Sequence, residues 1–179
     1  MSYRRLVGFG EAMLRMTARE GVALETATRF EASVGGAELN ACIAAERAGM
    51  PAAWVSALPD SSLGRHVHRH VRANGVEAVV VTRPNARLGL YFLAMAPPPH
   101  SLRITYDRTG SAFALLEPDS VDWKGVLAPD ACLLISGITP PLGDGPRRAM
   151  EEALTTAGDV GATVALDVNY RAALWSRAR

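Results

Sequence analysis

Apolar runs alternate with amphipathic segments along the chain. Short apolar runs bounded by glycine or polar residues predict buried strands, and segments of strong helix formers that stop at glycine or asparagine predict helices. The expected strands are 4–9, 52–58, 76–82, 131–136 and 162–167, and the expected helices are 37–48, 63–73 and 146–157. This alternation predicts an α/β fold with a mainly parallel sheet covered by helices.

One region breaks this rhythm. The apolar segments 89–95 and 102–108 are joined by the short loop APPPHS, with no helix between them. Such an arrangement predicts an antiparallel hairpin that stands off the main sheet. Because side chains alternate across a strand, Tyr106 and Arg108 share one face of the second strand, and Tyr91 can meet them from the first. We therefore expect two tyrosines and an arginine to line one surface.

Composition narrows the class of protein. The 179 residues suit one domain, and they are 49% hydrophobic with a formal net charge of +1. No apolar run reaches the length of a membrane span, no secretory signal is recognisable, and the arginines are scattered rather than clustered. Cys42 and Cys132 lie in apolar segments without a CxxC pattern, so we expect buried thiols. We expect a soluble cytoplasmic protein that binds neither membranes nor nucleic acid.

A glycine pair is the first candidate for chemistry. Gly35 and Gly36 come directly before the predicted helix that contains Asn40. Paired glycines allow backbone amides to approach a ligand at the positive end of a helix. The same pair also fits a simple turn before a helix, and taken alone it favours that interpretation.

Polar residues after the last predicted strand form the second candidate. Asp167, Asn169 and Arg171 follow the carboxyl end of a parallel strand, where open α/β sheets bind their ligands. A capped turn with a surface arginine fits the same residues equally well.

The end of the predicted hairpin is the third candidate. An arginine fork such as that of Arg108 binds a carboxylate through parallel hydrogen bonds, and tyrosines offer a sugar both a flat face and a hydroxyl. A solvated arginine is the plainer alternative.

Two further patterns carry less information. His66 and His70 lie four residues apart on a predicted helix and could share a metal, but no third ligand is near, so a solvated face is favoured. Residues 143–145 (Gly-Asp-Gly) resemble a phosphate cradle only superficially, and Asp144 is more simply a helix cap or turn residue.

A set of motifs together resembles the PfkB carbohydrate kinase family, and within it the 2-keto-3-deoxygluconate kinases. In order along the chain, they are FGEAM at 9–13, VGGAELN at 34–40, LPDSSLGRHV at 58–67, GLYF at 89–92, YDRTGSA at 106–112, SGIT at 136–139 and DVNYRAALW at 167–175. One departure is LPDSSLG at 58–64, where the family usually reads LGDDPFG.

The resemblance implies a ribokinase-like fold over 1–179, with β lid segments at about 12–34 and 87–109 inserted in the α/β core. It also places Glu11 near the position at which ribose-using relatives carry a sugar-binding aspartate, and Asn40 near the sugar. The residues that it implies for the substrate are Gly36, Tyr91, Tyr106, Arg108, Ile138 and Arg171, and those for the nucleotide phosphates are Asn169 and Arg171.

The implied activity is phosphorylation of a sugar hydroxyl by ATP with Mg²⁺. Two arginines at the implied sugar site favour a sugar acid over a neutral sugar. The family's catalytic aspartate belongs to a Gly-Ala-Gly-Asp loop, and these 179 residues contain no such loop. We therefore expect an amino-terminal part of a kinase with no catalytic residue of its own. The alternatives are a non-catalytic sugar-acid binding module and an inactive truncated fragment. We also expect a homo-oligomer through the lid or an exposed sheet edge.

Overall fold

The main sheet is entirely parallel. The structure is a computed structural model that describes residues 4–94, 102–172 and 174–175. The strand order of the main sheet is β5-β4-β1-β8-β9. In sequence order, these strands are β1 (Arg5–Phe9), β4 (Ala52–Pro59), β5 (Glu77–Arg83), β8 (Ala131–Ser136) and β9 (Thr163–Asp167).

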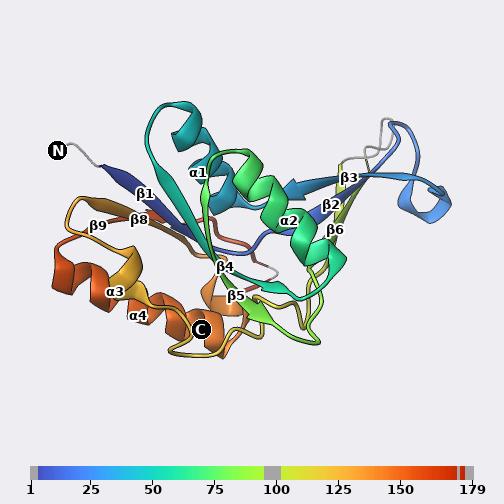
Figure 1. Cartoon of the computed structure of the whole chain (residues 1–179). Coiled ribbons are helices and arrows are strands. Elements are labelled where there is room, and N and C mark those ends of the chain that lie inside the picture. The colour runs from blue at the N-terminus through green and yellow to red at the C-terminus, as the bar shows by residue number, and fades with distance from the viewer. Residues whose placement is uncertain (1–3, 95–101, 173, 176–179) are drawn as a thin grey trace.

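Helices cover both faces of the main sheet. Figure 1 shows α1 (Ala37–Arg47) and α2 (Ser62–Ala73) on one face, and α3 (Trp123–Val126) and α4 (Asp144–Val160) on the other. Each face has its own core, one built around Trp54 and the other around Phe9. None of the helices that the structure describes is long and apolar enough to cross a membrane. The predicted α/β class, with helices on a mainly parallel sheet, is confirmed.

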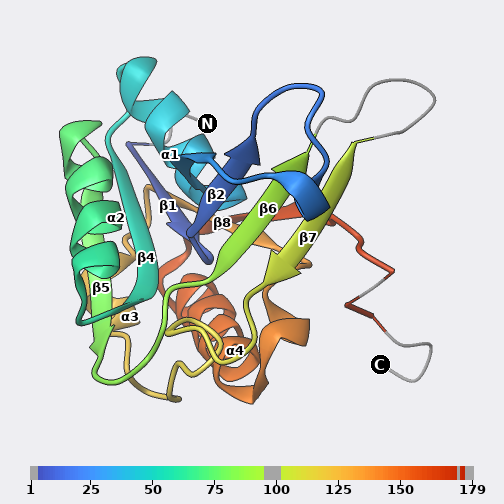
Figure 2. The same cartoon turned by 90° about the vertical axis from the view of Figure 1, so that its right-hand side faces the viewer.

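A second sheet of four strands, here called the small sheet, stands beside the carboxyl ends of β1 and β8 (Figure 2). Its strand order is β3-β2-β6-β7. The strands are β2 (Met13–Ala18), β3 (Phe30–Gly35), β6 (Leu90–Ala94) and β7 (Arg103–Asp107). β6 and β7 pair antiparallel, which confirms the predicted hairpin, whereas the loop between them lies outside the described residues. Whether the small sheet acts as a lid stays a prediction.

The predicted elements match the observed ones with small shifts at their ends. The largest shift is in α4, which begins two residues before and ends three residues after the predicted 146–157. The expected cap role of Asp144 is wrong, because Gly143 is the N-cap residue and Asp144 is the first helical residue. Asp144 Oδ1 lies 3.7 Å from Arg147 Nε, one turn along the helix. Its carboxylate still lies at the helix end that favours negative charge. Cys42 and Cys132 are buried free thiols, as expected.

Candidate functional site

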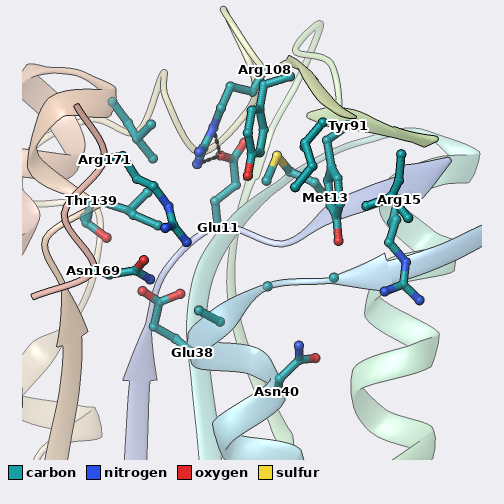
Figure 3. Close-up of a pocket in the computed structure, with 18 residues that line it drawn as sticks. Glu11, Met13, Arg15, Glu38, Asn40, Tyr91, Arg108, Thr139, Asn169 and Arg171 are labelled. Carbon is teal, nitrogen blue, oxygen red and sulfur yellow. Dashed lines mark hydrogen bonds and ion pairs between the residues drawn. The ribbon is translucent and has the colours of Figure 1, made fainter. Parts of the chain in front are cut away.

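A cavity of about 290 Å³ opens between the main sheet and the small sheet (Figure 3). Its floor lies at the carboxyl ends of the parallel strands β1, β8 and β9, the place where open α/β sheets bind ligands. Seven residues from five separate segments of the chain were predicted for a site, and the structure brings all of them to this cavity. They are Gly36, Tyr91, Tyr106, Arg108, Ile138, Asn169 and Arg171.

The small sheet contributes an aromatic wall. Tyr91 and Tyr106 are cross-strand partners, with ring centroids 5.7 Å apart and planes 32° from parallel. Arg108 follows β7 and places its Cζ atom 6.0 Å from the centre of the Tyr106 ring. The shared surface expected from side-chain alternation is therefore present. Burial raises the pKa of the Tyr91 hydroxyl, so this hydroxyl is a neutral hydrogen-bond donor or acceptor at the cavity.

Arg108 forms a buried ion pair with Glu11. The Arg108 Nε donates to Glu11 Oε2 at 2.8 Å, and Nη2 donates to the same oxygen. The two side chains are only 13% and 3% exposed, so the alternative of a solvated arginine is wrong. These two bonds use two of the five guanidinium N–H groups, which leaves three on the side chain for a ligand.

The second oxygen of Glu11 is an unused acceptor. Glu11 Oε1 is buried and has no hydrogen-bond partner in the part of the chain that the structure describes. A buried polar atom without a partner costs free energy, on the order of 1–3 kcal/mol. This oxygen lies against Gly89, where a Cβ atom would be 2.7 Å away, so it faces the protein rather than the cavity.

The glycine pair brings the start of α1 to the cavity. Gly36 is the N-cap residue, and its φ of −175° is open to any residue, so conformation does not require glycine. The lack of space requires glycine, because a Cβ atom at Gly36 would lie 2.8 Å from the Glu11 carbonyl oxygen and 3.2 Å from Ala12 Cα. The simple interpretation, a helix start, is therefore confirmed, and contact of the pair with a ligand stays a prediction. The pair starts the helix, and it lets the positive helix end line the cavity.

Hydrogen bonds hold the segment after β9 against the loop after β8. The Gly137 amide donates to the Asp167 carbonyl at 2.9 Å, and Trp175 Nε1 donates to the Gly137 carbonyl at 3.0 Å. The Asn169 amide donates to Asp167 Oδ1 at 3.0 Å, and Asn169 adopts a left-handed φ of 35°. Asparagine tolerates this conformation better than most residues. Asp167 therefore shapes the turn, while Asn169 and Arg171 line the cavity.

Glu38 is a cavity residue that the sequence did not reveal. Its side chain is buried in the first turn of α1, and a Cβ atom at Gly10 would overlap its carboxyl group. Burial raises the pKa of Glu38, although its own backbone amide and the Ser136 hydroxyl lower it. In the sequence, an acid at this place is indistinguishable from an ordinary first-turn carboxylate that stabilises the helix.

The histidine pair on α2 does not contribute to the cavity. Burial, the neighbouring His66 and the Arg47 charge lower the pKa of His70. In the ranges that the structure describes, no group of three or more His, Cys, Asp or Glu residues could hold a metal ion.

The arrangement suits a polyhydroxylated anion. Arg108 and Arg171 supply positive charge, and the two tyrosine rings offer flat faces. A cavity of this volume is at the small end of ligand pockets.

The chain is similar in sequence to carbohydrate kinases. The family model described as "pfkB family carbohydrate kinase" matches residues 4–179. A 2-dehydro-3-deoxygalactonokinase from Haloferax volcanii is 42% identical over 171 residues, which are 96% of this chain and 54% of that protein. A 2-dehydro-3-deoxygluconokinase from Thermoproteus tenax is 34% identical over 172 residues, 95% of this chain and 51% of that protein.

A solved structure shares the fold. The crystal structure of 2-dehydro-3-deoxygluconokinase from Thermotoga maritima superposes with a TM-score of 0.90 at 34% identity, covering 97% of this chain and 53% of that one. The chain therefore spans about half the length of the relatives that it matches.

Proposed function

This chain belongs to the pfkB family of carbohydrate kinases, and we propose that its cavity binds the sugar of a kinase reaction in which ATP phosphorylates a 2-keto-3-deoxy sugar acid. The observation that carries this proposal is the convergence of seven predicted residues on one cavity that contains a buried arginine fork. Similarity to two kinases named for 2-dehydro-3-deoxy sugar acids, at 42% and 34% identity, supports the substrate class.

The proposed sugar contacts follow from the free hydrogen-bonding groups. The three remaining N–H groups of Arg108 face the sugar carboxylate, while Glu11 holds the guanidinium in place. Tyr91 and Tyr106 pack against the sugar, and the backbone around Ile138 and the amides at Gly36 close the floor.

Asn169 and Arg171 are the proposed residues nearest to the phosphates. Phosphoryl transfer depends mainly on positioning and on stabilising the charge of the transferred group. Arg171 is exposed at the rim of the cavity, where it can contact a sugar carboxylate or a phosphate. Mg²⁺ usually binds to nucleotide phosphates, water and one or two carboxylates. The described residues contain no group of three or more His, Cys, Asp or Glu that could hold a metal ion, and the proposal assigns no Mg²⁺ ligand.

A second candidate function comes from the sequence. These 179 residues contain no Gly-Ala-Gly-Asp loop, which supplies the catalytic aspartate in the family that the motifs resemble. On that basis, the chain by itself would be a sugar-acid binding module without catalysis.

Calorimetry and an activity assay separate the two functions. We expect 2-keto-3-deoxygluconate to bind to the chain in both cases. Formation of ADP that depends on the sugar acid would support the kinase and refute the module, whereas sugar binding without phosphorylation would support the module.

A variant tests the carboxylate contact. Arg171→Ala should weaken binding of the sugar acid at least tenfold more than binding of the neutral 3-deoxy-hexulose, in which a hydroxymethyl group replaces the carboxylate. Arg69→Ala is the matched control, because Arg69 is an exposed arginine on α2 that does not line the cavity. Equal losses for both sugars would refute a contact between Arg171 and the carboxylate and leave Arg171 with its proposed role at the phosphates.

Self-association is also part of the proposal. β9 is an edge strand of the main sheet, and Leu166 and the following Val168 are 59% and 68% exposed. Unpaired edge groups beside exposed apolar side chains favour association between chains. We propose that two copies associate at this edge.

A further inference from the structure

Glu38 is a buried acid inside a cavity for which we propose an anionic ligand. Its side chain is 5% exposed, yet it lines the cavity. Figure 3 shows its carboxyl group directed into the same space as the side chains of Asn169 and Arg171. No salt bridge to Glu38 occurs within the described ranges, whereas Glu11 has Arg108 as its partner. The cavity therefore contains one acid that is neutralised by an arginine and one that is not.

Burial is the main influence that opposes a negative charge on Glu38. It raises the pKa of Glu38, and Asp167 at the end of β9 also raises it, whereas the backbone amide of Glu38, the Ser136 hydroxyl and Arg108 lower it. Ser136 Oγ accepts a hydrogen bond from the Ile138 amide, so the proton of the Ser136 hydroxyl is available to donate to the Glu38 carboxyl. Cys42, one turn along α1, is a neutral thiol, because burial raises its pKa to about 12. The charged side chains that share the cavity with Glu38 are Glu11, Arg15, Arg108 and Arg171.

We infer that Glu38 takes up a proton when a sugar acid binds, and that it is a specificity-determining residue that matches the charge of the cavity to an anionic ligand. The inference rests on the proposed function. In this step, a proton from solvent joins one carboxyl oxygen of Glu38, and no bond of the sugar breaks. The neutral carboxyl no longer repels the sugar carboxylate, and its O–H becomes a hydrogen-bond donor.

The consequence is a defined dependence of affinity on pH. The complex binds more protons than the free chain, so affinity falls as pH rises between the pKa of Glu38 in the free chain and its pKa in the complex. The limiting slope for one proton is a tenfold increase in Kd per pH unit. Below this window, Glu38 is protonated in both states and the affinity is constant.

Titration calorimetry tests the inference directly. Binding of 2-keto-3-deoxygluconate would be measured from pH 5.5 to 8.5, in pairs of buffers that differ in ionisation enthalpy. We expect uptake of up to one proton per bound sugar acid within this range, and no uptake with the neutral 3-deoxy-hexulose.

Two variants identify the group that takes up the proton. Glu38→Gln, which resembles the protonated form, should bind the sugar acid with an affinity independent of pH and without proton uptake. Glu46→Gln is the matched control on the same helix, because Glu46 lies outside the cavity and its Oε1 accepts a bond from Ala52 that glutamine can keep. It should retain the uptake of the parent chain.

The outcomes are distinguishable. Sugar-acid binding without proton uptake, or uptake that persists in Glu38→Gln, would overturn this inference and leave the proposed function intact. Failure of the sugar acid to bind to the parent chain at any pH would overturn the proposed function and this inference together. Melting curves of both variants show whether each is folded.

Discussion

Removal of Arg108 should destabilise the protein far more than an ordinary surface substitution. In Arg108→Ala, the Glu11 carboxylate, which is 3% exposed in the parent chain, loses the two hydrogen bonds that neutralise Oε2, while Oε1 already has no described partner. Breaking a buried ion pair by removing one partner costs about 3–5 kcal/mol, because the other charge stays buried. For a chain of this length, that corresponds to a decrease in melting temperature of roughly 6–20 °C.

Urea unfolding of four proteins gives the required comparison. They are the parent, Arg108→Ala, Glu11→Gln and the double variant. Glu11→Gln should cost less than Arg108→Ala, about 1–3 kcal/mol, because the amide still offers an acceptor oxygen and Arg108 faces an open cavity. The double variant should be more stable than Arg108→Ala alone, since it contains no buried carboxylate at this place.

The free energies of unfolding of Arg108→Ala and of the double variant decide the test. A free energy of unfolding for Arg108→Ala within about 0.5 kcal/mol of the parent value is typical of a surface residue and would refute the buried pair. A double variant less stable than both single variants would refute the explanation by an unpaired charge.

Four other experiments, three on substitutions and one on thiol labelling, have defined outcomes. Gly36→Ala should lower the free energy of unfolding, measured by urea titration, by about 1–3 kcal/mol, because its Cβ would lie 2.8 Å from a backbone oxygen. Gly158→Ala, in an open position within α4, should raise the same free energy by about 0.5–1 kcal/mol. Leu166→Lys should reduce self-association in light scattering at high concentration, and an unchanged mass would contradict association at the β9 edge. Cys42, whose pKa burial raises to about 12, should react with a thiol reagent at pH 8 only after unfolding, and rapid labelling of the native chain would contradict its burial.

The small sheet shows where the pattern of apolar residues stops being informative. The hairpin of β6 and β7 was predicted because two apolar runs lie close together in the sequence. The apolar pattern did not identify β2 and β3 as strands, and only the family resemblance implied a β lid segment, at about 12–34, in this part of the chain. In β2, Leu14 packs on the core while Met13 and Arg15 line the cavity, so neither face of the strand reads as clearly buried or exposed. A strand between a core and a ligand cavity lacks the alternation that marks a strand between a core and water.

The apolar pattern and the motifs were enough to predict the local structure and the family. Helices and strands of the main sheet follow from periodicity and from stop signals close to them in the sequence, so their order could be predicted without a structure. The seven candidate site residues could be named because they occur in motifs whose order and spacing resemble one family.

The pairing of charges could not be predicted from the sequence. Glu11 and Arg108 are 97 residues apart, and nothing local to either residue indicates that one neutralises the other. Glu38 looks like an ordinary first-turn acid until the fold encloses it between Gly10 and the ends of β8 and β9. The energy of a charge depends on its distance from other charges and on its exclusion from water, and both are set only when distant segments meet.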